Sequence, residues 1–168
     1  MTAQRQERNR LSLGFAFMAL LAGVAAGPCL QTAAEAATTE RVVVDRYTGL
    51  ALGGFDPVAY FTDAHPVAGR AGFEAFEAGA FWRFHNEGNR ASFLAHPEIY
   101  GPQFGGYDPT GVARGVAVAG DPRFWLILRQ RLFLFSAAQS RDAFAADPAS
   151  LLRQARQRWP GVKETLAR

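Results

Sequence analysis

The apolar residues of this chain fall into short groups separated by turn-forming residues, apart from one uncharged run at residues 11–27. Groups rich in β-branched and aromatic residues predict strands, and groups spaced three and four residues apart predict helices. The predicted strands are residues 41–45 (a short strand or a lead-in), 52–61 (a turn that feeds a strand), 80–85, 124–128 and 132–135. The predicted helices are residues 89–95, 139–146 and 148–159. The glycine-rich stretch at residues 100–115 is predicted to be an irregular loop.

Proline and aspartate residues mark the expected helix ends. Pro97 closes the helix at residues 89–95, because the residue before a proline does not easily stay helical. Asp147 is the expected N-cap of the last helix, with Pro148 at its first position. Pro160 and Gly161 are expected to end that helix.

A shift of 51 positions aligns residues 81–98 with residues 132–149. The matched pairs are Phe84 with Phe135, Arg90 with Arg141, Phe93 with Phe144, Ala95 with Ala146, and Pro97 with Pro148. Either a duplicated strand-turn-helix unit or a coincidence of aromatic strands and alanine-rich helices explains these matches. The expected fold class is α+β, with a small antiparallel sheet, short helices packed on it, and this duplication as an open alternative.

The amino-terminal segment predicts export from the cytoplasm. Basic Arg5, Arg8 and Arg10 precede the uncharged run, which is shorter than a comfortable membrane span, and Ala34-Glu35-Ala36 offers a small-x-small cleavage pattern. We therefore expect a signal peptide at residues 1–36, a lead-in at 37–51, a domain at 52–168 and a periplasmic location. An uncleaved anchor is the alternative, and it would be the chain's one membrane contact.

Composition removes several classes of function. Cys29 is the only cysteine and lies inside the predicted signal peptide, so the processed domain has no thiol for a disulfide, a nucleophile or a metal. The formal net charge is only +3, and no nucleic-acid motif occurs. No hydrolase, phosphate-loop, zinc-protease or dinucleotide motif occurs either, so we expect a domain that is not an enzyme.

Several separated motifs resemble one known family. They are Gly54-Phe55-Asp56-Pro57-Val58-Ala59-Tyr60-Phe61, then Gly79-Ala80-Phe81-Trp82-Arg83-Phe84, then Asn89-Arg90 with Phe93, Pro97 and Tyr100, then Pro102-Gln103-Phe104-Gly105-Gly106-Tyr107. In this order they resemble the YHS-domain family, and its stand-alone exported members most of all, from about residue 52 to residue 159. The resemblance implies a compact α+β domain related to small metal-binding modules.

The resemblance also implies where a metal would bind. Cysteine ligands of metal-competent relatives correspond here to Ala59, His85 and Asn89, and a further cysteine of the exported subgroup corresponds to Asp108. His85 and Asp108 are therefore the first candidate ligands and Asp56 the third, for copper or another divalent metal, because imidazole and carboxylate replace thiolate. The alternatives are a histidine that hydrogen-bonds a backbone group and two turn-forming aspartates.

We thus expect a non-catalytic binding or accessory domain of the cell envelope, associated with a transition metal such as copper. One alternative is a metal-free domain that meets an envelope protein through its glycine-rich loop or its basic carboxyl-terminal helix. Another is a small-molecule pocket near Tyr60 and Tyr107, although both tyrosines also suit a core. No nucleic-acid partner is expected.

Overall fold

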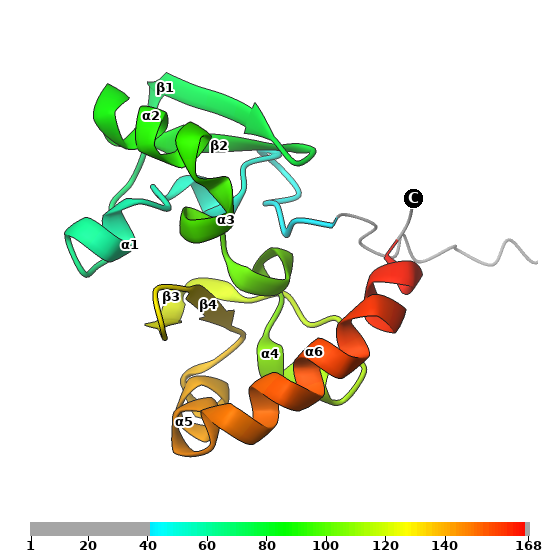
Figure 1. The fold of residues 1–168 in the computed structure, drawn as a ribbon. Helices are drawn as coiled ribbons and strands as arrows, with labels where there is room; N and C mark the ends of the chain where they lie inside the picture. Colours follow the sequence, from blue (N-terminus) through cyan, green and yellow to red (C-terminus); the bar gives the residue numbers. More distant parts are fainter. Residues whose placement is uncertain (1–40, 167–168) are drawn as a thin grey trace, which may run out of the picture. The chain divides into compact units, whose positions relative to one another are not determined.

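The computed structural model describes residues 41–166. The chain divides into two units, Met1–Ala33 and Ala34–Arg168, and all described residues belong to the second. They form six α-helices, two 3₁₀ helices and two antiparallel hairpins, which confirms the expected α+β class (Figure 1). The expectation of a single sheet is wrong, because each hairpin is a separate two-stranded sheet. The predicted signal peptide and its cleavage pattern lie outside the described residues.

The first half of the described chain is one strand-turn-helix unit, which we call the first repeat (residues 50–101). Its elements are η1 (Leu52–Gly54), α1 (Ala59–Thr62), β1 (Arg70–Glu77), β2 (Ala80–Phe84), α2 (Glu87–Ala95) and α3 (Pro97–Tyr100). Helix α2 begins after Asn86, whose side chain accepts a hydrogen bond from the Asn89 amide at 2.8 Å. This helix packs against both strands of the hairpin (Figure 1).

The second repeat (residues 102–166) has the same order of elements. They are η2 (Gln103–Gly106), α4 (Pro109–Ala113), β3 (Asp121–Ile127), β4 (Leu132–Phe135), α5 (Ala138–Ala146) and α6 (Pro148–Thr165). Asp147 caps α6 through the Ser150 amide, with Pro148 in the first turn, as the sequence predicts. Helix α5 packs on the hairpin, and α6 packs against α4. None of the described helices has the length and apolarity needed to cross a membrane.

The two repeats agree in backbone detail, which confirms the duplication. At an offset of 52 positions, one more than in the hairpins, Leu52 and Phe104 have φ angles of 54° and 55°, and Gly54 and Gly106 have φ angles of 86° and 90°. A left-handed φ at a bulky residue is rare, so its occurrence at both equivalent positions is not a coincidence. Both hairpins also carry an irregular register, between Arg70 and Glu74 in the first and between Asp121 and Trp125 in the second.

Strand β4 is buried on both faces. Leu132 and Leu134 belong to the core cluster of the first repeat, whereas Phe133 and Phe135 pack with Phe144 of α5. All four strand residues are at most 2% exposed. A strand buried on two sides has no polar face, which explains its continuous apolar sequence.

Two expected strands are absent and one strand was not expected. Residues 52–61 form η1 and the short helix α1 instead of a strand, because Asp56 and Pro57 start a turn that leads directly into the helix. Residues 41–45 contribute only an isolated bridge between Val44 and Ala51. Strand β1 was missed because Ala71 and Gly72 at its start give little strand signal.

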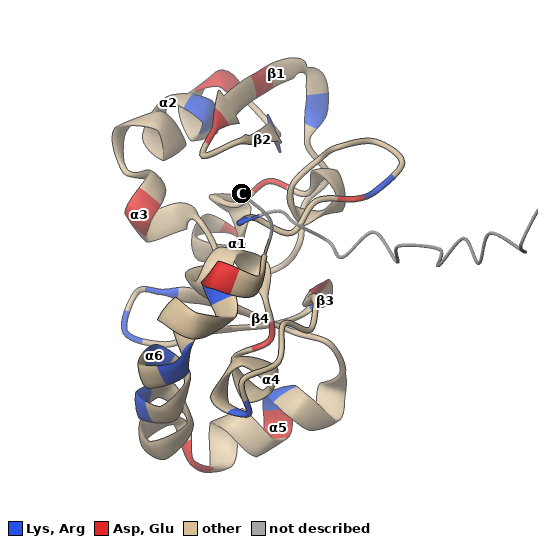
Figure 2. Ribbon diagram, turned by 90° about the vertical axis from the view of Figure 1, so that its right-hand side faces the viewer, with Lys and Arg blue, Asp and Glu red and all other residues tan. Residues whose placement is uncertain are grey.

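Helix α6 extends past its predicted end to Thr165, with Pro160 inside it. Val162 and Leu166 beyond the proline are buried at 4% and 5% exposure, so packing holds the helix together there. Its basic residues Arg153, Arg156 and Lys163 are exposed. Figure 2 shows Lys and Arg positions in blue along this helix.

Candidate functional site

Asp56 is a fully buried aspartate at the turn of the first repeat, with 0% exposure. Its Oδ1 accepts a hydrogen bond from the Val58 amide at 2.8 Å, as expected of a turn-forming aspartate. Its Oδ2 accepts from the His85 amide at 2.8 Å and from Asn89 Nδ2 at 2.6 Å. One carboxylate therefore joins the turn before α1 to the junction between β2 and α2.

Asp108 holds the equivalent position in the second repeat, at 1% exposure. Its Oδ1 accepts from the amide and hydroxyl of Thr110, both at 2.8 Å, and so caps α4. Its Oδ2 accepts from the Ser136 amide at 2.9 Å and from Ser136 Oγ at 2.7 Å. Burial alone would raise the pKa of Asp108, but the hydrogen bonds from Ser136 and Thr110 together lower it below the usual value.

The predicted metal ligands are not assembled into one site. The structure brings Asp56 to the backbone of His85, but it places Asp108 in the other repeat. Among residues 41–166, no three histidine, cysteine, aspartate or glutamate side chains form a group that could hold a metal ion. Of the positions that the resemblance marks as ligands, Ala59 has no donor atom, and the Asn89 amide nitrogen donates to Asp56.

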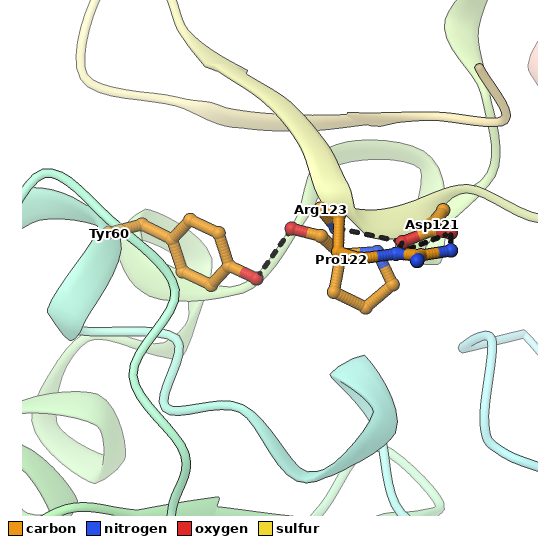
Figure 3. A network of polar contacts seen from close by, with 4 residues as sticks. All are labelled: Tyr60, Asp121, Pro122 and Arg123. Carbon is orange, nitrogen blue, oxygen red and sulfur yellow. Dashed lines mark hydrogen bonds and ion pairs between the residues drawn. The ribbon is translucent and has the colours of Figure 1, made fainter. Parts of the chain in front are cut away.

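Tyr60 and Tyr107 are core residues at 1% and 2% exposure. The Tyr60 hydroxyl donates to the Pro122 carbonyl at 2.9 Å, which links the first repeat to the second (Figure 3). Burial, together with the nearby charge of Asp121, raises the pKa of Tyr60 above its ordinary value, so the phenol stays a neutral donor. Neither tyrosine is among the residues that line the cleft described next.

A cleft of about 360 Å³ lies between the two repeats. Leu52 and Phe55 of the first repeat and Ala119, Pro122 and Leu134 of the second line it. Gly53 and Gly106, which belong to the left-handed turns of the two repeats, also line the cleft, and they add no side chain to its space. Its volume falls within the range of about 300–1,000 Å³ that is usual for small-molecule sites.

Three charged residues add polar groups to this cleft, namely Asp45, Asp121 and Arg123. Arg123 donates to Asp121 through Nη2 at 2.5 Å, and the bond from this guanidinium is the main reason that the pKa of Asp121 is lowered (Figure 3). The Asp45 carboxylate accepts from the Thr48 amide at 2.8 Å and is held in a fixed turn. The cleft thus joins apolar walls to a few fixed charges, which is typical of a binding site.

Comparison of the chain with protein-family models, with curated proteins and with solved structures finds no match.

The sequence did not reveal Asp121 and Arg123 as site residues. They follow a glycine at the start of a strand, and nothing in their spacing distinguishes them from an ordinary turn. The signal that could have found them is the repeat. The offset of 51 positions makes Asp121, at the start of β3, equivalent to Arg70, at the start of β1. The first residue of this strand is therefore acidic in one repeat and basic in the other.

Proposed function

We propose that this chain is an exported, non-catalytic binding domain of the YHS type that works without a bound metal and takes a small ligand into the cleft between its repeats. The observation that carries the proposal is the pair of buried aspartates. Each repeat keeps its strand-to-helix junction in place with a carboxylate that is fully hydrogen-bonded by protein groups.

The polar groups at the family's ligand positions support the metal-free interpretation. Asn89 uses its amide nitrogen on Asp56, and Ser136, which is equivalent to His85, uses its hydroxyl on Asp108. Among the described residues, no buried side-chain nitrogen or oxygen lacks a hydrogen-bond partner. To bind a metal, Asp56, Asp108 and Asn89 would each have to give up such a bond, and this loss costs about 1–3 kcal/mol for a buried group.

The position of the cleft supports small-ligand binding. Ligand sites form preferentially where two structural units meet, because walls from both units can surround a molecule. Here both repeats supply apolar walls, and Arg123, whose side chain is 74% exposed, supplies an accessible positive charge. Because Asp45 and Asp121 also line the cleft and Arg123 is paired with Asp121, the cleft has no net positive charge, and a small molecule with an apolar body matches these features best.

The repeat provides a matched test of the cleft. Ala119 lines the cleft and is exposed, and its equivalent Ala68 is also exposed but lies outside it. The probe is 8-anilinonaphthalene-1-sulfonate, an aromatic sulfonate whose fluorescence rises in apolar sites. We expect saturable binding that Ala119→Trp weakens by at least about tenfold, a loss of about 1.4 kcal/mol in binding free energy. The control variant Ala68→Trp should bind the dye like the wild type. Equal affinities in the two variants would rule out the cleft as the site.

The metal-free part of the proposal has its own test. The protein is titrated with Cu(II), Cu(I) and Zn(II), together with the variants His85→Ala and Asp108→Ala. We expect no saturable binding tighter than about micromolar, which is weaker than a built site with several ligands gives. Tighter binding that both substitutions weaken would instead support the copper association predicted from the sequence.

A further inference from the structure

The two hairpins present equivalent faces to very different surroundings. In the second repeat, the cross-strand pairs Trp125 with Leu134 and Ile127 with Leu132 form one face. The offset of 51 residues makes these pairs equivalent to Glu74 with Arg83 and Phe76 with Phe81, which are also cross-strand pairs. The same face of the same unit therefore exists twice in the chain.

The face of the second repeat is covered by the first repeat. Leu132 and Leu134 are 0% and 2% exposed and belong to the first repeat's core cluster. The Trp125 ring packs edge-on against Tyr60, with ring centroids 5.3 Å apart. This face is therefore built to be buried by another unit.

The face of the first repeat is open. Phe76 and Phe81 are 61% and 51% exposed, and their rings lie against each other with centroids 4.9 Å apart. Glu74 and Arg83 form an ion pair of 2.6 Å beside them, and each side chain is about one-third exposed. Figure 2 shows both acidic and basic positions on this hairpin. Adjacent exposed aromatic residues with a polar rim are typical of an interaction surface.

We infer that this open face, made of Glu74, Phe76, Phe81 and Arg83, is a self-association surface that pairs with the same face of a second copy of the chain. A two-fold interface needs a patch that is complementary to itself. An aromatic pair beside an ion pair meets this need, because a two-fold rotation can bring the Glu74–Arg83 pair of one copy against that of the other, acid opposite base, while the phenylalanines pack together.

A head-to-tail dimer would need a free surface of the kind that covers the β3–β4 hairpin, and each chain uses that surface internally. The surface that covers the β3–β4 hairpin is the Tyr60 side of the first repeat, and it is already occupied there. Its equivalent in the second repeat lies around Val112, which is fully buried in a cluster with Ala155 of α6. A second copy therefore has neither surface free, and pairing of like faces remains.

Sedimentation velocity of the purified protein over a range of concentrations tests this inference. We expect a concentration-dependent monomer–dimer equilibrium that Phe76→Ser with Phe81→Ser weakens by about 100-fold, as expected for loss of central aromatic residues. The matched control is Leu94→Ser with Val116→Ser, two exposed apolar residues elsewhere, and it should dimerise like the wild type. All four side chains are exposed, so both double variants should keep the wild-type circular dichroism spectrum.

Charge reversal tests the two-fold pairing itself. Arg83→Glu alone should weaken the dimer by placing like charges at the interface, and Glu74→Arg with Arg83→Glu should restore it. A protein that stays monomeric at every concentration, or a dimer that the phenylalanine variant leaves intact, would overturn the inference. Dye binding in the cleft is expected to survive the phenylalanine substitutions, so failure here is distinguishable from failure of the proposed function.

Discussion

Each repeat contains one buried aspartate whose carboxylate joins distant parts of that repeat. Each carboxylate accepts hydrogen bonds from residues far away in sequence, from His85 and Asn89 in one case and from Ser136 in the other. A buried carboxylate is costly unless donors surround it, and here backbone and side-chain donors do so. Removing the acceptor would leave those donors buried without a partner.

Asp108→Asn should therefore lower the free energy of unfolding by about 2–4 kcal/mol, because the new amide faces the Ser136 donors with its own hydrogens. Chemical denaturation at pH 7 measures the loss. Asp142→Asn is the control, since Asp142 is exposed and pairs only with Arg141. A loss no larger than that of the control would contradict the structural role of Asp108.

The pKa of Asp108 gives a prediction for acid. Its pKa is lower in the folded protein than the value of about 3.9 in an unfolded chain, so the unfolded state binds the proton more tightly. The resulting stability is present above about pH 3.9 and is lost as the pH falls through the folded-state pKa. We expect the wild type to lose stability more steeply in acid than Asp108→Asn, as measured by urea unfolding between pH 2 and pH 6. Parallel curves would show that Asp108 does not contribute.

Each repeat begins with a left-handed turn that precedes its helices and strands. Gly54 and Gly106 have φ angles near +90°, a region that residues with a Cβ rarely adopt. Space is not the constraint at Gly106, because an added Cβ would lie 3.5 Å from its nearest neighbour, Val43 Cβ. The backbone angle alone therefore requires glycine at this position.

Gly106→Ala should destabilise the protein by about 1–2 kcal/mol through backbone strain. Gly161→Ala in α6 is the matched control, because this glycine has open space around it and lies within a helix. The control should raise stability by up to about 1 kcal/mol, since alanine favours helix over glycine. Thermal unfolding of both variants measures the opposite signs, and a shift of the same sign in both would contradict the account of the turn.

The entire domain should unfold as one unit, because the repeats share a core. Leu132 and Leu134 of the second repeat are buried in the first repeat's cluster, and Tyr60 reaches across to the Pro122 carbonyl. Trp82 reports on the first repeat and Trp159 on the second. In a variant that keeps only Trp82 and in one that keeps only Trp159, with Trp125 replaced in both, tryptophan fluorescence and circular dichroism should give the same unfolding midpoint in urea, as all-or-none unfolding requires. Two different midpoints would mean that the repeats fold separately.

Local features of this protein could be predicted from its residues in order. The β3–β4 hairpin, the helices after each hairpin, the Asp147 cap of α6 and the turn roles of Asp56 and Asp108 all follow from neighbours a few positions apart. The offset along the chain suggests the duplication but leaves coincidence open, and the paired left-handed turns and hairpin irregularities support it. Strand β1 escaped, because its small residues at positions 71 and 72 carry little propensity.

Contacts between residues far apart in the sequence decide which faces of the helices and hairpins are covered. The sequence does not show these contacts. The cleft exists because turns 52 residues apart come together, and Asp56 and Asp108 bind different strand-to-helix junctions because they lie in different repeats. Helix α6 passes Pro160 because Val162 and Leu166 are buried beyond it. Periodicity and capping act within one turn or strand, whereas burial depends on which surface packs opposite, and only the folded chain supplies that surface.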